Sequence, residues 1–588
     1  MSTKPNKKNN ESELLQEQII KLEKQLESFK HSNDHFLKNK LFLHYDIKEP
    51  EKVVVDCETK LPVLKEAEKK AILKGEEQSP THLLLEGDNY HALSVLNYTH
   101  AGKIDLIYID PPYNTGNRDW KYNNDYVDAE DSFRHSKWLS FMASRLRLAK
   151  NLMKDDGFIV CAIDHYELFY LGILMDTVFG EENRLGIVSV VHKPEGRNQE
   201  KFFGTSNEYA LFYAKNKKLA NFNKIAIDDE ILEAFDQEDE KGRYRLKNFI
   251  RLADGKYATR SAKPNFWYPI YVSKDLKKIS IDKKNGYYEV YPIIDSGVER
   301  TWKTLPNTFL DLLKEDSIVA DLDENGKVVI YEKLRENQVI KTHWIKKEYH
   351  AYHHGTKPLE SILGEAKLFD FPKSVILIED ILRLTTDASA TVLDFFAGSG
   401  TTGHAVLNLN ARDGGNRQFI LCTNNENKIA EDVTYPRIKK VISGYGATAG
   451  IPANLRYFQT DFVERKGSTS QLKIDLTRQC AEMICVKENV FEAVKLKKQA
   501  KNYKFFKNGN KYLGVFFDFF TDPEFTDFIA ELNKLPQESE KVVYIFVLDG
   551  SASIFADEFA GVSNCEIKEI PQKILDIYKQ LAREVARK

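Results

Sequence analysis

Short apolar runs that end on an acidic residue recur along this chain, and segments with helical periodicity separate them. Three such runs lie in the first third of the chain, at "LLLEGD" (83–88), "KIDLIYID" (103–110) and "GFIVCAID" (157–164). A fourth, "ATVLDFFAGSG", passes through Asp394 into a glycine-rich turn. Buried strands that alternate with helices form parallel βαβ units, because each helix carries the chain back to the start of the next strand. The pattern therefore predicts an α/β protein with a doubly wound sheet.

The alternation stops between residues 220 and 350 and resumes afterwards. Within this interval, residues 241–278 hold eleven Lys or Arg against two Asp, with aromatic side chains between them. Such a segment predicts either a nucleic-acid-binding domain or the solvated face of a structural insertion. We expect five parts: a disordered tail and amphipathic or coiled-coil helix (1–45), half of the α/β domain (46–220), an inserted domain (221–350), the second half (351–446) and a C-terminal α/β domain (447–588).

The N-terminal part contains a short heptad seam, formed by Leu15, Ile19, Leu22, Leu26 and Phe29. It covers about two heptads, so it predicts either a helix packed on its own domain or a contact between two copies of the chain.

Composition excludes several classes of protein. The chain has no apolar stretch of transmembrane length and no apolar signal segment at its start, which predicts a cytoplasmic protein. Its six cysteines form no C-x-x-C pair, which argues against a disulfide framework or a metal site. With a net charge of −3, any nucleic-acid binding requires a local basic face.

The glycine-rich turn after Asp394 predicts a cofactor site. Gly398, Gly400 and Gly403 have the G-x-G-x-x-G spacing, and a helical segment follows. Glycines let a cofactor approach the backbone, and a helix N-terminus favours negative charge. The turn lacks the G-K-[ST] sequence of a P-loop, which leaves a dinucleotide or S-adenosylmethionine. A carboxylate at Asp394 suits an α-ammonium group and repels a pyrophosphate, and an acid on the next strand, Glu426, would bind the ribose of either cofactor.

The strand at 103–110 runs into Asp110, Pro111, Pro112 and Tyr113. Two prolines hold a rigid extended turn without N–H donors, which leaves the carboxylate and the turn carbonyls as a row of acceptors. Such acceptors bind an exocyclic amino group, and the Tyr113 ring can stack on a base that has left its helix. The acceptors aim the amino lone pair at a methyl sulfonium, so geometry and proximity supply the catalysis. Alone, the tetrapeptide is equally compatible with a simple strand-ending turn.

Together the two motifs resemble a known family. "IDLIYIDPPYN" and "VLDFFAGSGTTG" are similar to the catalytic and cofactor motifs of the amino-group DNA methyltransferases. With DPPY at 110–113 and FAGSG at 396–400, their order resembles the beta group, in which the target-recognition domain lies between the two motifs. The resemblance covers residues 80–445 and implies a circularly permuted S-adenosylmethionine-dependent methyltransferase sheet. The segment "KPNFWYPIYV" and the chain length are similar to modification subunits of type III restriction-modification systems.

The resemblance implies roles for individual residues. Asp110 and the Pro111 carbonyl would accept from the target amino group, in the turn that Pro112 completes. Tyr113 would stack on the flipped base. Asp before the prolines implies adenine-N6 as the target, because the cytosine-N4 enzymes mostly have Ser there. The implied ligands of S-adenosylmethionine are Asp394, Phe396, Ala397, Gly398, Gly400, Thr401 and Thr402 for the methionine part, Glu426 for the ribose, Asp88 for the adenine and Lys373 for the carboxylate.

The resemblance also assigns the basic insertion to DNA binding, in which Lys and Arg contact phosphates and some side chains read base edges. The expected contacts are Arg243, Arg245, Lys247, Arg251, Arg260 and Lys263, with Lys193 and Arg197 in a second loop at 192–204. The implied partners are double-stranded DNA, a second copy of the chain and a separate restriction (helicase-nuclease) subunit. The C-terminal domain is the candidate docking surface.

Three alternatives remain open at this point. The enzyme could methylate cytosine-N4 or an adenine in RNA. The chain could be a non-catalytic DNA-recognition subunit, although intact DPPY and FAGSG motifs argue against this. It could also be a nicotinamide oxidoreductase, which the acid before the glycines disfavours.

Overall fold

The computed structural model describes residues 50–76, 79–196, 201–223, 235–252, 255–335, 340–496, 500–518 and 523–586. The predicted heptad helix within residues 1–45 and the predicted DNA contact Arg197 lie outside these ranges. No helix in the described part of the chain combines the length and the apolar character needed to cross a bilayer.

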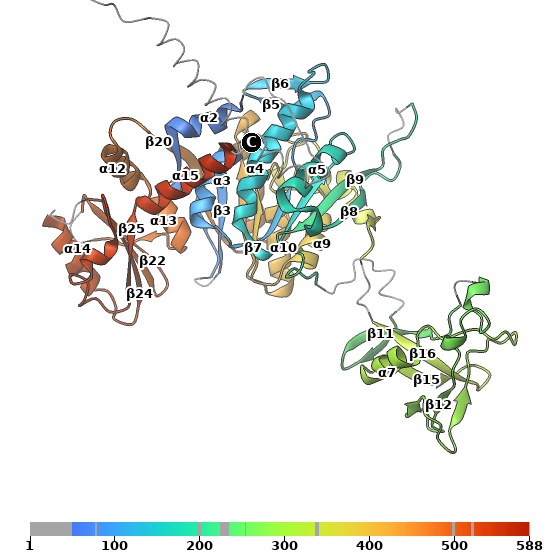
Figure 1. Ribbon diagram of the computed structural model, residues 1–588. Coiled ribbons are helices and arrows are strands. Elements are labelled where there is room, and N and C mark those ends of the chain that lie inside the picture. The colour runs from blue at the N-terminus through green and yellow to red at the C-terminus, as the bar shows by residue number, and fades with distance from the viewer. Residues whose placement is uncertain are drawn as a thin grey trace, which may run out of the picture.

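One large sheet forms the middle of the molecule (Figure 1). Its strands run in the order β1-β20-β3-β19-β18-β4-β7-β9-β8-β17, and β2 pairs with β20. The inner strands β3, β19, β18, β4 and β7 are parallel, as predicted, whereas β9 is antiparallel to both of its neighbours. The strands are β1 (Lys60–Glu66), β2 (Ile72–Leu73), β3 (Thr81–Glu86), β4 (Ile104–Ile109), β7 (Met153–Ile163), β8 (Arg184–Val191), β9 (Asn207–Ala214), β17 (His343–Trp344), β18 (Thr391–Asp394), β19 (Gln418–Thr423) and β20 (Asn454–Glu464).

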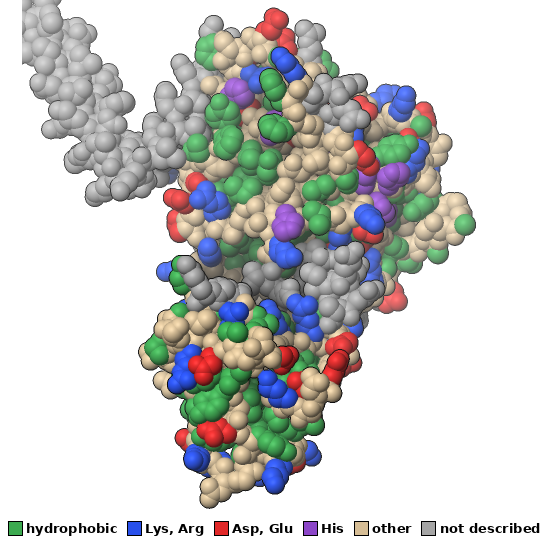
Figure 2. Space-filling model, turned by 90° about the vertical axis from the view of Figure 1, so that its right-hand side faces the viewer, with side chains coloured by type: hydrophobic (Ala, Val, Ile, Leu, Met, Phe, Trp, Pro, Cys, Tyr) green, Lys and Arg blue, Asp and Glu red, His purple; other side chains and the backbone are tan. Residues whose placement is uncertain are grey.

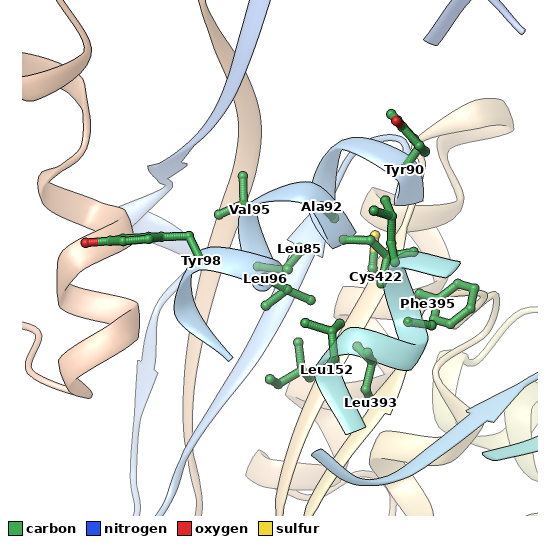
Figure 3. Close-up of a cluster of buried hydrophobic side chains, with 14 of the residues drawn as sticks. Leu85, Tyr90, Ala92, Val95, Leu96, Tyr98, Leu152, Leu393, Phe395 and Cys422 are labelled. Atoms are coloured by element: carbon green, nitrogen blue, oxygen red, sulfur yellow. The ribbon is translucent and has the colours of Figure 1, made fainter. Parts of the chain in front are cut away.

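Helices cover both faces of this sheet, so its inner strands are apolar on both sides. Leu83, Leu84 and Leu85 on β3 are each at most 1% exposed, and successive side chains enter opposite core clusters. One cluster, part of which Figure 3 shows, packs α3 (Asn89–Thr99), α4 (Arg134–Leu152) and α5 (Leu168–Phe179) on the sheet. The other packs α8 (Lys357–Leu363), α9 (Val375–Thr385), α10 (Thr401–Asp413) and α11 (Tyr435–Ser443) on the opposite face.

Strands from distant parts of the chain are neighbours in this sheet. The late strands β18 and β19 lie between the early strands β3 and β4. The sheet also includes β17 and β20, so the insertion ends before residue 343 and the α/β domain continues to 464. The boundaries that we expected at 350 and 447 are therefore displaced. Both strands lie towards the ends of the sheet, and β17 has only two residues, which gives too little apolar pattern to signal a strand.

The basic insertion forms a body of its own, residues 235–335, which stands apart from the large sheet in Figure 1. It has its own apolar core, built around Phe249, Trp302 and Phe309. One sheet has the order β10-β11-β16-β15 and another the order β13-β12-β14. The elements are β10 (Gln237–Asp239), β11 (Gly242–Asn248), β12 (Ile270–Val272), β13 (Ile279–Ser280), β14 (Tyr288–Val290), α7 (Pro306–Lys314), β15 (Ile318–Leu322) and β16 (Val328–Arg335).

The C-terminal part adds a five-stranded sheet with the order β21-β22-β23-β24-β25. Its helices α13 and α15 pack against α3 of the first domain, and the Lys487 ammonium of α13 lies 3.9 Å from the centre of the Tyr98 ring. The Tyr578 hydroxyl donates to the Pro62 carbonyl of β1. The elements are α12 (Thr469–Gln479), α13 (Ala481–Glu488), β21 (Glu492–Ala493), β22 (Tyr503–Asn508), β23 (Lys511–Phe516), α14 (Pro523–Asn533), β24 (Glu540–Phe546), β25 (Cys565–Ile570) and α15 (Gln572–Ala586).

Candidate active site

The two sequence motifs meet at one edge of the large sheet. Strand β18 pairs in parallel with β4, with Val392 opposite Leu106 and Leu393 opposite Ile107. Asp394 ends β18, and Asp110 directly follows β4, so both acids lie at the carboxyl edge of adjacent strands. This is the edge at which open α/β sheets bind ligands.

Asp394 is a buried carboxylate, 3% exposed, that is held by two donors. Its Oδ1 accepts from the Phe396 N–H at 3.0 Å, and its Oδ2 accepts from the Thr402 hydroxyl at 2.6 Å. Burial raises the pKa of Asp394 to about 7, although both hydrogen bonds oppose the rise. Within the described residues no cation forms an ion pair with Asp394. A ligand with a positive group would therefore stabilise the ionised form.

The glycine turn has a backbone shape that larger residues disfavour. Gly398 and Gly400 have φ values of 48° and 79°, and a Cβ on Gly398 would lie 3.0 Å from the Phe369 ring. Gly403 faces inwards, where a Cβ would lie 2.9 Å from Ile438. Ala397 anchors the turn by donating its N–H to the Cys422 carbonyl of β19 at 3.1 Å.

Two predicted cofactor ligands, Thr401 and Thr402, use their hydroxyls in hydrogen bonds within the protein. The Thr402 hydroxyl holds Asp394, and the Thr401 hydroxyl accepts from the buried Arg437 guanidinium at 2.9 Å. Arg437 also donates to the Ser399 carbonyl and hydroxyl. These side chains therefore brace the loop from within the protein. Sequence reasoning missed Arg437, because it follows the glycine motif by more than thirty residues.

The two acids implied for the nucleoside of the cofactor follow β3 and β19 at the same edge of the sheet. Asp88 caps α3 by accepting from the Tyr90 N–H at 2.8 Å, and it lies 3.1 Å from the buried Arg145 guanidinium. Glu426 forms an ion pair with Lys121, which lies on β5 (Asn117–Tyr122) of the hairpin formed with β6 (Asp125–Asp128). Each acid thus has a basic partner that the sequence did not signal.

Lys373 lies in the DPPY site, whereas the resemblance had implied a contact with the cofactor carboxylate. Its ammonium is 2.8 Å from Asp110 Oδ2, 3.3 Å from Glu208 Oε2 and 2.8 Å from the Tyr113 hydroxyl. Glu208 also accepts from the Tyr113 hydroxyl at 2.6 Å. Gly355 lies close to the segment that carries Lys373. A Cβ on Gly355 would lie 2.2 Å from the carbonyl oxygen of Pro372, the residue before Lys373, so a larger residue would displace this segment.

Two carboxylates share this one cation: Glu208 is buried, and the Asp110 side chain is 26% exposed. Burial raises the pKa of Asp110, and Glu208 adds to the rise while Lys373 opposes it. Burial also acts on Glu208, but Lys373 and the Tyr113 hydroxyl outweigh it and lower the pKa. The pKa of Lys373 is raised, because the two acids outweigh its own desolvation. Lys373 therefore stays charged and keeps Asp110 available as an acceptor.

One face of the Asp110 turn still offers acceptors. Asp110 Oδ1 is buried and lacks a hydrogen-bond partner. Pro112 is already bonded, because its carbonyl accepts from the Trp138 indole at 2.7 Å. The Pro111 carbonyl receives no hydrogen bond within the described part of the chain. Asp110 Oδ1 and the Pro111 carbonyl are thus the acceptors that an amino group can use.

The residue after the motif, Asn114, holds the turn from beneath. It is fully buried and adopts φ 59°. Its amide donates to Glu167 at 2.5 Å and accepts from the Trp120 indole at 2.9 Å. Glu167 also contacts His135 at 2.5 Å, and burial raises the pKa of Glu167 to about 8. Sequence reasoning missed Glu167 and Glu208; the available signal for Glu208 was an acid at the start of an otherwise apolar strand.

The predicted DNA contacts divide into two groups. Arg243, Arg245 and Lys247 alternate along β11, so they lie on one face of that strand. Lys193 is exposed after β8, and Lys263 precedes a short helical turn of the insertion.

Two other predicted contacts are engaged within the insertion itself. Arg251 donates to the Lys303 carbonyl at 2.5 Å, and Arg260 pairs with Glu299 at 3.1 Å. The assignment of these basic residues to DNA stays a prediction.

The fold and the two motifs at one sheet edge define a class. The chain belongs to the DNA methylase family, whose model matches residues 104–432 and so includes both motifs. It is 34% identical over 388 residues to the type III restriction-modification enzyme EcoPI Mod subunit of Escherichia phage P1, covering 60% of this chain and 58% of that protein. It is 33% identical over 384 residues to the type II methyltransferase M.KpnI of Klebsiella pneumoniae, covering 65% of this chain and 88% of that protein. The StyLTI Mod subunit of Salmonella typhimurium is 32% identical over 395 residues and covers 62% of this chain and 56% of that protein.

Proposed function

We propose that the chain transfers a methyl group from S-adenosylmethionine to the N6 amino group of an adenine in double-stranded DNA. The observation that carries this proposal is the pair of open acceptors, Asp110 Oδ1 and the Pro111 carbonyl, beside a buried carboxylate, Asp394, on the adjacent strand. Asp110 can thus accept a hydrogen bond from the substrate, and Asp394 can pair with a positive group of the cofactor.

The residues present fit S-adenosylmethionine. Asp394 would bind its α-ammonium group, and the turn from Phe396 to Gly400 would contact its methionine part. Glu426 would contact the ribose, and Asp88 would lie near the adenine. When bound, this cofactor supplies an electrophilic methyl group on sulfur. The late strands β18 and β19 between β3 and β4 support the proposal that the methyltransferase sheet is circularly permuted.

The chain's own residues would act on the target base by position and by hydrogen bonding. Asp110 Oδ1 and the Pro111 carbonyl would accept the two amino hydrogens and aim the nitrogen lone pair at the methyl group. The Tyr113 ring would stack on the flipped base, with its hydroxyl fixed by Glu208 and Lys373. Adenine is favoured over cytosine-N4, because Asp rather than Ser precedes the prolines.

We further propose that residues 235–335 recognise the target sequence, with Arg243, Arg245 and Lys247 along one strand face. Two of the relatives above are named as Mod subunits of type III enzymes. This supports assembly with a restriction subunit, with the C-terminal domain as the docking or dimer surface. The chain spans 58% of the EcoPI Mod subunit, so these assignments are proposals for the whole protein.

Sequencing of modified bases tests the function directly. DNA from cells that express the chain should contain N6-methyladenine at one short recurring sequence, and DNA from cells expressing Asp110→Ala should not. Mass spectrometry of nucleosides separates this product from N4-methylcytosine and from methylated RNA. Tight DNA binding without any methylated nucleoside would instead favour a non-catalytic recognition subunit.

The buried Asp394 predicts a pH dependence of cofactor binding. With its pKa near 7, Asp394 is protonated as the pH falls below that value and can no longer pair with an ammonium group. The dissociation constant of S-adenosylmethionine should therefore rise by up to about tenfold per pH unit below pH 7. Isothermal titration calorimetry from about pH 5.5 to about pH 7.5 measures this dissociation constant. Asp394→Asn should bind S-adenosylmethionine weakly, with no such pH dependence.

The same shift makes a prediction for the protein without cofactor. Because the pKa of Asp394 is raised above its unfolded value, its contribution to stability is lost as the pH rises from about 4 to about 7. At pH values above 7, Asp394→Asn should raise the midpoint temperature of thermal unfolding, because it removes a destabilising contribution of up to roughly 4 kcal/mol. Near pH 4 the substitution should have little effect. An unchanged midpoint above pH 7 would contradict the buried, unpaired carboxylate.

A further inference from the structure

Four phenylalanines are far more exposed than an apolar side chain normally is. Phe169, Phe202, Phe203 and Phe371 are 77%, 83%, 92% and 81% exposed, and the other exposed large apolar side chains of the described residues reach at most 62%. We call these four residues the aromatic rim. Figure 2 views the molecule from the side on which β8, β9 and the insertion lie, and it shows hydrophobic side chains in several groups on that surface.

All four rim residues come from segments at the carboxyl edge of the sheet. Phe169 follows β7, which pairs in parallel with the DPPY strand β4. Phe202 and Phe203 lie in the loop between β8 and β9, and the pairing of Val191 with Asn207 places that loop at the same edge. Phe371 lies two residues before Lys373, with φ 55°.

Each rim segment is tied to the DPPY motif, or to Asn114 directly after it, by one polar residue nearby in the chain. Glu167, two residues before Phe169, accepts from Asn114 at 2.5 Å. Glu208, five residues after Phe203, accepts from Tyr113 at 2.6 Å.

The third tie belongs to the Phe371 segment, where Lys373 contacts Asp110 at 2.8 Å. Three separate segments thus each carry exposed phenyl rings at most six residues along the chain from a side chain that contacts Asp110, Tyr113 or Asn114.

Two lysines accompany the Phe202 part of the rim. Lys193 is exposed in the same loop as Phe202, and the Lys201 ammonium lies 5.4 Å from the centre of the Phe202 ring. Aromatic faces stack on unpaired bases of any sequence, and neighbouring lysines bind the phosphates. Exposed rings from separate segments, with two lysines in the Phe202 loop, fit bases and phosphates better than they fit the continuous apolar surface of a protein partner.

We propose that the aromatic rim stacks on the bases next to the target adenine and on its abandoned partner, and so holds the opened base pair while the adenine occupies the DPPY site. This inference rests on the proposed function and adds to it the residues that open the duplex. Phe202 and Phe203 carry the largest part, because they are the most exposed of the four.

The test compares methylation of paired and pre-opened substrates. The variant Phe202→Ala/Phe203→Ala and wild type are assayed on a duplex with the methylated sequence and on the same duplex with an abasic site opposite the target adenine. On the paired duplex we expect the double variant to lose about 10- to 100-fold in initial rate, the range for loss of base stacking. On the abasic duplex it should regain a rate within about threefold of wild type, because the base is already free.

A matched control removes exposed apolar surface elsewhere. Leu73 is 62% exposed on β2 and pairs with Asn454, at the opposite edge of the sheet, so Leu73→Ala should match wild type on both substrates. Phe371→Ala provides a second rim variant on a different segment, with the same expected pattern.

Three results would overturn the rim proposal. If the double variant lost the same factor in rate on both duplexes, the phenylalanines would act in catalysis or folding. If the double variant matched the wild-type rate on both duplexes, they would have no role in opening DNA. A change of oligomeric state in light scattering, with unchanged rates per active chain, would make the rim an interface between copies. Failure of the proposed function looks different, since wild type would then methylate neither duplex.

Discussion

Asp110→Ala should abolish methyl transfer while leaving cofactor binding within about twofold of wild type. Asp110 Oδ1 is one of two open acceptors at the end of β4, and without it the amino group is neither held nor aimed. Removing one such contact from a preorganised site costs about 100- to 1,000-fold in rate, and here the charge is lost as well, so we expect at least about 1,000-fold. A tritiated-methyl assay measures the rate, and calorimetry measures the binding of S-adenosylmethionine.

Two further variants make this result specific. Asp110→Asn keeps the size of the side chain but not its charge, and it should retain a small residual rate. Asp461→Ala removes a surface acid of the same domain, 48% exposed and 4.0 Å from Lys65, and should behave as wild type. Normal turnover by Asp110→Ala would exclude the assigned role.

Lys373→Met should produce the second largest loss, with a pH profile that identifies the cause. Without the ammonium, Asp110 and Glu208 face each other with no cation, and the pKa of the shared site rises further. Ionised Asp110 accepts from the amino group more strongly than protonated Asp110, so the rate near neutral pH should fall by roughly 100-fold and recover partly as the pH increases. Initial rates measured at saturating cofactor from about pH 6 to about pH 9.5 would show this recovery of the rate.

A double variant separates charge from packing. In Lys373→Met/Glu208→Gln the second carboxylate is gone, so Asp110 should ionise more easily and the pH dependence should move back towards that of wild type. Lys373→Arg keeps the charge and serves as the conservative control. If Lys373→Met weakened only the binding of S-adenosylmethionine, with kcat unchanged, Lys373 would belong to the cofactor site that the sequence resemblance implied.

The sequence was informative where chemistry is local in the chain. The strand that ends in Asp110 and the turn after Asp394 each combine an apolar run, an acid and special backbone residues within about a dozen positions. The structure places both at one sheet edge, because parallel strands have their carboxyl ends on the same side.

What the sequence did not show are the partners that come from elsewhere. Lys373 reaches Asp110 across more than 260 residues, and Glu208 reaches Tyr113 across 95. Neither contact has a spacing that a motif can record, because only the folded sheet brings those segments together. Arg145 and Arg437 were missed for the same reason: they are long side chains that reach a motif from helices on either face.

The strand order also has a consequence for synthesis of the protein. Strands β3 and β4 are made early, but β18 and β19, which lie between them, are made only after the 235–335 body, and β20 pairs with both β1 and β3. A growing chain that has emerged up to the insertion therefore holds the catalytic turn without the strand that supports it. The proposed ability to modify DNA would arise late and in one step, when β18 and β19 pair between β3 and β4. A ribosome-bound fragment of this length would expose its proline turn with Phe169, Phe202 and Phe203, but it would contain neither Phe371 nor the glycine turn proposed to hold a methyl donor.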